Sequence, residues 1–132
     1  MPEAKSPEPG ARSIALWAPV LLYMAVIFGL SSISHPPSTP GGSDKVLHAL
    51  SYGVLGFLFA RALTGGRDAV TPRVVILTIC FGAAYGASDE LHQYFNPPRA
   101  VEAADLLADT IGAGLGAGAL YAWGIIRGRN GL

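Results

Sequence analysis

The chain alternates between long apolar stretches and short polar connections, and this pattern predicts four helices. The apolar stretches cover residues 14–32, 46–63, 74–92 and 106–126. A transmembrane helix needs about 20 mainly apolar residues. The first and fourth stretches reach this length comfortably, whereas the second and third have to draw polar groups into the membrane interface. The pattern favours an all-α integral membrane bundle of four transmembrane helices.

The connections between these stretches contain residues that interrupt helices. Proline and glycine occur at 36–42, at Gly65 and Gly66, at Pro72, and at Pro97 and Pro98. The opening residues hold several prolines and little apolar content, which is typical of a disordered segment. We therefore expect a disordered cytoplasmic tail over residues 1–13, one membrane domain over 14–126, and a short cytoplasmic tail over 127–132.

Composition indicates lipid rather than water as the surroundings of this chain. Of its 132 residues, 51% are hydrophobic and 14% are charged, whereas an ordinary soluble domain carries about 25% charged residues. A soluble enzyme is a poor fit, because so short a chain cannot cover four apolar stretches. The formal net charge is zero and no basic stripe with interleaved aromatic residues is present, so no nucleic-acid partner is expected.

Charge is distributed unequally between the two predicted ends of the bundle. Most basic residues fall in the two tails and the second connection, which four spans place on one side: Lys5, Arg12, Arg61, Arg67, Arg73, Arg127 and Arg129. Cytoplasmic segments are enriched in Lys and Arg, so both termini are predicted to be cytoplasmic at the bacterial inner membrane. A competing interpretation makes residues 14–30 a cleaved signal peptide, although this run is longer than a usual signal core.

Pairs of glycines recur in the predicted helices. They are Gly53 and Gly56, Gly82 and Gly86, Gly112 and Gly116, and Gly114 and Gly118. Small residues allow helix backbones to approach closely in lipid. We expect these glycines to pack helices within one chain, while an oligomer formed through the glycine-rich faces stays open as the alternative.

Ionisable and polar residues share helix faces near the predicted outer ends of three helices. With spacings of three and four, the groups are Asp44, His48, Ser51 and Tyr52; Asp89, His92 and Gln93; and Asp105, Asp109 and Gly112. Charged groups are costly at membrane depth unless they are paired or hydrated, so they indicate a functional site. The simplest arrangement points the three groups at one another, with Arg99 reaching in from the third connection.

Structural roles compete with functional ones at several of these positions. Asp44 suits the first turn of a helix, Lys45 can face lipid headgroups, and His48 and Tyr52 can hydrogen-bond between helices. Asp109 is the hardest to explain structurally, because it lies a full turn inside the fourth stretch. Acids outnumber bases here, and Asp, Glu and His can hold a divalent ion. No HExxH, paired CxxC or EF-hand motif is present, so the sequence leaves metal and cofactor undetermined.

The order and spacing of these motifs resemble the VanZ-like integral membrane family. The resemblance is carried by Asp44-Lys45-x-x-His48-x-x-x-Tyr52, by Asp89-Glu90-x-x-Gln93-x-Phe95-x-Pro97-x-Arg99, and by Asp105 followed by Asp109-Thr110-x-Gly112. Asp109 and Glu102 depart from the family pattern, where Asn and a small hydroxyl residue are frequent. The resemblance implies a small multi-helical protein of the cell envelope and a link with resistance to the glycopeptide teicoplanin, but no reaction.

Two functions follow as expectations. The first is an enzyme or specific binder for a lipid or lipid-linked cell-wall precursor with a phosphate-bearing group. Its candidate catalytic residues are Asp89, Glu90, His48, Asp105 and Asp109, and its candidate binding residues are Arg99, Gln93, Tyr52, Asp44 and Lys45. Guanidinium suits a phosphate because it can bind two oxygens at once. The second function is a non-catalytic interaction or transport module that works as an oligomer or as a partner subunit in the bilayer.

Overall fold

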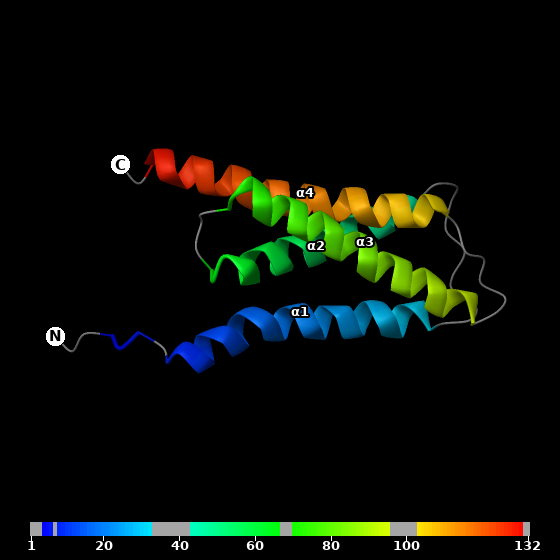
Figure 1. The fold of residues 1–132 in the computed structure, drawn as a ribbon, viewed down its shortest axis with the longest axis horizontal. Coiled ribbons are helices and arrows are strands. Elements are labelled where there is room, and N and C mark those ends of the chain that lie inside the picture. The colour runs from blue at the N-terminus through cyan, green and yellow to red at the C-terminus, as the bar shows by residue number, and fades with distance from the viewer. Residues whose placement is uncertain (1–3, 7, 33–42, 67–69, 96–102, 131–132) are drawn as a thin grey trace.

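The computed structural model describes residues 4–6, 8–32, 43–66, 70–95 and 103–130, and every regular element among them is a helix. The helices are α1 (Pro9–Ser31), α2 (Ser43–Leu63), α3 (Pro72–Tyr94) and α4 (Ala103–Asn130). They alternate in direction, so the start of α1 and the end of α4 lie at the same end of the bundle (Figure 1). The predicted all-helical architecture is confirmed.

All four helices extend beyond the limits that the apolar pattern predicted, and α1 and α4 do so furthest. α1 begins at Pro9, so residues 9–13, which were expected to be part of a disordered tail, are helical. Proline suits this first turn, because the N–H that it lacks would have no intrahelical partner there. α4 likewise continues to Asn130, past the expected end at Ile126. An apolar pattern marks only the part of a helix that faces lipid, and polar residues continue the helix on either side.

Two glycines determine where α2 ends. Gly65 and Gly66 have φ angles of 68° and 78°, a region that other residues enter at a cost. The Gly66 N–H donates to the Arg61 carbonyl over 2.9 Å, and the Gly65 N–H donates to the Ala62 carbonyl over 3.1 Å. These are the two bonds of a Schellman motif. The Arg12 guanidinium donates to the Gly65 carbonyl over 2.6 Å, which ties the start of α1 to this turn.

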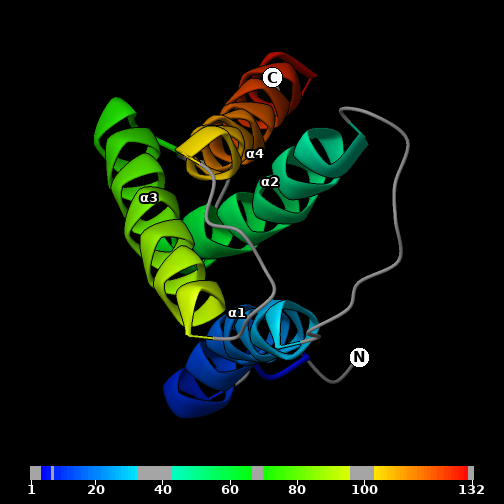
Figure 2. The same cartoon turned by 90° about the vertical axis from the view of Figure 1, so that its right-hand side faces the viewer.

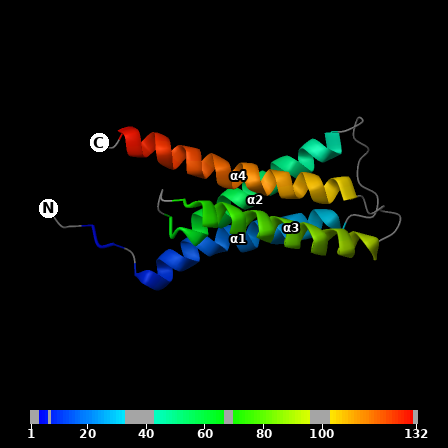
Figure 3. The same cartoon turned by 45° about the horizontal axis from the view of Figure 1, so that its top comes forward.

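α2 and α4 form the most extensive helix pair, and they cross each other in Figure 3. Glycine makes their contact close. A Cβ atom added to Gly112 would collide with the carbonyl of Ala49, and one added to Gly116 would collide with the carbonyl of Gly53. The glycine spacing therefore serves packing within one chain, since only small residues allow two backbones to touch.

α1 lies on one side of the bundle, against α2 and α3 and away from α4 (Figure 2). Its residues Leu16, Val20 and Ile27 join a buried apolar cluster with Tyr52 and Leu55 of α2. A smaller cluster consists of Ala60 of α2, Val70 just before α3, and Ala117 and Leu120 of α4. The apolar core thus lies mainly between α1, α2 and α3, and the closest backbone packing lies between α2 and α4.

Polar side chains are buried in this bundle, while many large apolar side chains are exposed. The buried polar residues are Ser31, Thr78, Asp89, Glu90, Gln93, Asp105 and Asp109. Leu22, Phe28 and Leu115 are among the apolar side chains that are more than half exposed. Exposed apolar surface on this scale favours contact with lipid or with another protein. The distribution fits a bundle that hydrocarbon surrounds and that keeps its polar groups inside.

Three helices are long and apolar enough to cross a membrane, as judged by length and composition. They are α1, α2 from Asp44 to Leu63, and α3. α2 and α3 reach this length because each includes polar residues at the end where α2 begins and α3 stops. α4 is not among the three, and its sequence contains several glycines together with Asp105 and Asp109. The crossing of the membrane by α4 therefore stays a prediction.

We expect Gly116→Ala to destabilise the protein by about 1–3 kcal/mol, because the added methyl group overpacks the contact between α2 and α4. Gly118→Ala is the matched control, since nothing lies within 4 Å of a Cβ atom added there and alanine is the better helix former. Thermal unfolding in detergent, followed by circular dichroism, compares the two variants. Equal unfolding temperatures would contradict the close packing of these helices.

Candidate functional site

A group of ionisable side chains lies at the end of the bundle opposite the start of α1 and the end of α4. It comprises Asp44, Lys45 and His48 of α2, Glu90 of α3, and Asp105 and Asp109 of α4, and we refer to it as the ionisable cluster. Asp109 follows the start of α4 by six residues, which places it roughly 9 Å along the helix. α2, α3 and α4 all contribute to this cluster, but α3 does so through Glu90 and not through the face of Asp89, His92 and Gln93 that was expected to converge.

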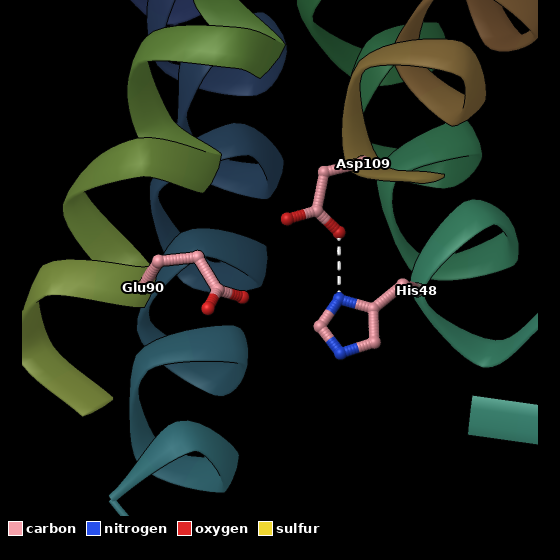
Figure 4. A group of neighbouring side chains, drawn as sticks. All are labelled: His48, Glu90 and Asp109. Carbon is pink, nitrogen blue, oxygen red and sulfur yellow. Dashed lines mark hydrogen bonds and ion pairs between the residues drawn. The ribbon is translucent and has the colours of Figure 1, made fainter. Parts of the chain in front are cut away.

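The innermost contact of the cluster joins His48 and Asp109. Nδ1 of His48 lies 2.7 Å from Oδ1 of Asp109 (Figure 4). A carboxylate oxygen is an acceptor, so the imidazole N–H donates. The Asp109 side chain is 0% exposed and that of His48 is 19% exposed. Removing one partner from a buried ion pair is strongly destabilising. We therefore infer that His48 offsets the free-energy cost of burying the Asp109 carboxylate.

A glycine on α3 provides the space for the Asp109 carboxylate. A Cβ atom added to Gly86 would lie 2.9 Å from Oδ2 and 3.1 Å from Cβ of Asp109. A larger residue would push α3 away from α4 at this level. Glu90 follows Gly86 by four residues and so shares its helix face. One face of α3 therefore makes room for Asp109 at Gly86 and supplies Glu90 to the cluster.

Lys45 forms the outer part of the cluster. Its Nζ lies 2.7 Å from Oδ2 of Asp44 and 2.6 Å from Oδ1 of Asp105. The other oxygen of Asp105, Oδ2, lies 3.8 Å from Nε2 of His48, so Asp105 links the outer contacts to the inner pair. Side-chain exposure falls from 44% at Asp44 through 31% at Lys45 and 10% at Asp105 to 0% at Asp109. The contacts therefore lead from the surface into the bundle.

Glu90 and Tyr52 lie at the inner end of the cluster. Figure 4 shows the Glu90 carboxylate extending from α3 toward His48 and Asp109, and one ligand atom from each of the three lies within 4.8 Å of the others. One imidazole and two carboxylates form a donor set that a divalent metal ion accepts. The Tyr52 hydroxyl is buried and makes no hydrogen bond within the described part of the chain.

Asp89 and Gln93 belong to a neighbouring polar group on the side of α1. The Gln93 amide donates to Oδ2 of Asp89 over 3.5 Å and to the Ser31 hydroxyl over 3.4 Å, which are long hydrogen bonds. Adjacent residues on a helix point in different directions, so Asp89 and Glu90 have different neighbours. His48 pairs with the two carboxylates of α4, and no such contact joins it to Asp89 among the described residues.

α1 makes contacts that no sequence pattern indicated. The Tyr85 hydroxyl donates to the backbone carbonyl of Met24 over 2.6 Å. His92 stacks on Phe28 with 4.3 Å between the ring centroids, which directs its ring toward α1. A single polar residue within an apolar stretch carries no periodic signal, so Tyr85 could not have been identified from the sequence.

Arg99 lies outside the described residues, and its expected contribution stays a prediction.

Comparison with known proteins identifies a family. A sequence model of the family described as VanZ/LLP1 matches residues 6–126, which include every member of the ionisable cluster. Searches of curated proteins and of solved structures found no match. The family match agrees with the resemblance that the spacing of the motifs suggested.

We expect His48→Ala to destabilise the protein by about 3–5 kcal/mol, because it leaves the buried Asp109 carboxylate without its partner. Asp109→Asn should cost less, since an amide oxygen still accepts a hydrogen bond and no buried charge is left behind. The double variant should therefore be more stable than His48→Ala alone. Denaturant unfolding in detergent measures all three.

His92→Ala serves as the matched histidine control for this cycle. It removes a stacked ring contact with Phe28 and an exposed hydrogen bond of 2.9 Å between Nε2 and the Ser32 hydroxyl, so its cost should be about 1–2 kcal/mol. Strictly additive effects of His48→Ala and Asp109→Asn would show that the two side chains are not coupled.

Proposed function

The chain belongs to the VanZ/LLP1 family of membrane proteins, and from this premise we propose that it binds or acts on a lipid or lipid-linked cell-wall precursor with a phosphate-bearing headgroup. The observation that carries this proposal is the ionisable cluster, whose exposure falls from Asp44 at the surface to the buried Asp109. Charges within a membrane bundle are expensive and mark functional sites by default. Well-packed apolar residues would meet a purely structural need at least as well.

The proposed setting is the bacterial cytoplasmic membrane, crossed four times with both termini in the cytoplasm. Arg12, Arg61, Arg73 and Arg127 support this orientation, because they lie near helix ends on the side where α1 starts and α4 stops (Figure 1). Lys and Arg concentrate on the cytoplasmic side of membrane proteins. The ionisable cluster then faces outward at the level of the lipid headgroups.

Lys45 is the first cationic group of the cluster that a ligand meets from the surface. Its ammonium group, 31% exposed, is held between Asp44 and Asp105, and it has three donors to share with an incoming phosphate. Arg99 lies between α3 and α4 in the sequence, and its guanidinium is suited to bind two phosphate oxygens. The acyl chains of the ligand then stay in the surrounding hydrocarbon.

His48 supplies the acid–base chemistry in this proposal. Its ring lies between Asp109 at Nδ1 and Asp105 near Nε2. A carboxylate that holds Nδ1–H orients the ring and stabilises its cationic form, so Nε2 can exchange a proton with a bound headgroup. Asp105 and Asp109 are then positioning residues, and His48 is the group that contacts the ligand.

The alternative function is a non-catalytic membrane module that works as an oligomer or a partner subunit. The paired glycines motivated this alternative. However, the backbone of α2 already packs against Gly112 and Gly116. Their spacing is accounted for without a second chain. Gly118 has open space around it, so an oligomer would have to use this face of α4 or the exposed apolar side chains.

We expect cells that express the wild-type protein to differ from vector-only cells in their lipid and cell-wall precursor profile, or in teicoplanin tolerance. His48→Gln and Asp105→Asn should abolish this difference at equal protein level, because losing a general acid–base group typically costs 10²-fold or more in rate. His92→Gln is the matched control and should behave as wild type. Site variants that match wild type would rule out a role of the cluster in this pathway.

Cysteine labelling tests the proposed orientation. In a Cys80→Ala background, Ser38→Cys places a thiol between α1 and α2, and Ser6→Cys places one before α1. A membrane-impermeant maleimide should label Ser38→Cys in intact cells and Ser6→Cys only after permeabilisation. Retention of an N-terminal epitope would count against cleavage of the first helix. Labelling of both thiols from outside would contradict the topology.

A further inference from the structure

The cluster brings together three side chains of the kinds that bind metal ions, and Glu90 among them has no role in the acid–base chemistry proposed for His48. His48 of α2, Glu90 of α3 and Asp109 of α4 each offer one ligand atom, and these atoms lie within 4.8 Å of one another (Figure 4). We propose that these side chains bind one divalent transition-metal ion of the Zn²⁺ or Mn²⁺ class. The ion would join three helices at the point where the cluster is most deeply buried.

The geometry needs only a small adjustment to hold such an ion. Bonds from zinc to nitrogen and oxygen are about 2.0–2.2 Å, so tetrahedral ligand atoms lie roughly 3.5 Å apart. The Glu90 side chain is flexible enough to close the remaining distance. Oδ2 of Asp109 makes no hydrogen bond within the described residues, and it is the atom that Asp109 would offer. Nδ1 is the ring nitrogen of His48 that faces Asp109, so a bound ion would take the place of the Nδ1 proton between the imidazole and the carboxylate.

The charges of the three residues favour a cation. Glu90 is 5% exposed and Asp109 is 0% exposed, so two carboxylates lie in the interior beside one imidazole. Lys45 contacts Asp44 and Asp105 nearer the surface. A dication bound by Glu90 and Asp109 would carry a charge opposite to that of both carboxylates, and a bound ion is often the largest local charge in such a site.

Tyr52 provides an independent indication of a ligand at this place. It is 1% exposed, and its hydroxyl has no hydrogen-bond partner among the described side chains and backbone groups. Tyr52 follows His48 by one turn on the same face of α2, and its hydroxyl lies within electrostatic reach of Asp109, Asp89 and Glu90. Buried hydroxyl groups are nearly always hydrogen-bonded. An oxygen held by the ion, from water or from a phosphate, is a suitable acceptor.

The donor set also indicates which ion and which kind of site. Mg²⁺ and Ca²⁺ prefer oxygen ligands alone, whereas imidazole suits zinc and its transition-metal neighbours. Three protein ligands leave a coordination position open, as in catalytic zinc sites. Such an ion would attract a phosphate to a cluster that is otherwise rich in acids. The site itself stands on the three side chains and on Tyr52, and it does not depend on the proposed lipid function.

Direct metal binding tests this proposal. Full-length protein in detergent is stripped with EDTA, titrated separately with Zn²⁺ and Mn²⁺, and desalted before metal analysis. We expect about one ion per chain for at least one of the two metals, and at least tenfold weaker binding in His48→Gln and Glu90→Gln. Mg²⁺ and Ca²⁺ should bind far more weakly. His92→Gln and Glu8→Gln change one histidine and one acid outside the cluster, and both should keep wild-type affinity.

Two results would overturn the metal site: no stoichiometric binding of either metal by the wild type, or unchanged binding in His48→Gln and Glu90→Gln. Thermal unfolding without metal checks that each variant is folded. If Glu90→Gln does not fold, Glu90→Asp replaces it, since it keeps the charge but withdraws the ligand and should also bind more weakly. The assay contains no lipid, so an unchanged lipid profile alongside intact metal binding would reject only the proposed function.

Discussion

The close approach of the α2 and α4 backbones is the contact on which the rest of the structure depends. In hydrocarbon no hydrophobic force brings helices together, so packing and polar contacts have to do so. Gly112 and Gly116 allow α4 to rest against the carbonyl groups of α2. His48 and Asp109 lie within one turn of this contact, and they meet because the two backbones are so close. A wider helix pair would leave the Asp109 carboxylate buried without a partner.

The cluster distributes its charges according to the cost of burying them. Asp44 and Lys45 pair near the surface, where solvent lowers the cost of each charge and also weakens their attraction. Asp105 and His48 follow at intermediate depth, and Asp109 lies deepest with the imidazole as its hydrogen-bond partner. Exposure therefore decreases along the chain of contacts from the Asp44–Lys45 pair to the His48–Asp109 pair.

Below the cluster the bundle becomes apolar. The ring of Tyr52 lies 6.2 Å from that of Tyr85, Tyr85 lies 6.2 Å from Phe81, and Phe81 stacks on Phe59 at 3.9 Å. This aromatic series lies between the cluster and the end of the bundle where α1 starts. Within the described part of the chain, the exposed members of the cluster are Asp44 and Lys45, at the end away from these rings.

Local features of the sequence predicted the helical architecture, the family and most members of the cluster. Apolar length, the glycines after α2 and the spacing of Asp105 and Asp109 are read from neighbouring residues, and the cost of charge in lipid holds whatever the neighbours are. The start of α1 at Pro9 and the end of α4 at Asn130 were not predicted, because helix ends in polar surroundings leave no trace in an apolar pattern.

Only the tertiary structure decided which residues meet. Lys45 pairs with Asp105 across 60 positions of sequence, Gly86 makes room for Asp109, and Asp89 contacts Gln93 rather than His48. Each of these contacts depends on how far a helix is rotated about its axis and where it crosses its neighbour. The glycines and side chains of several helices set those two quantities together, so no single stretch of sequence contains them.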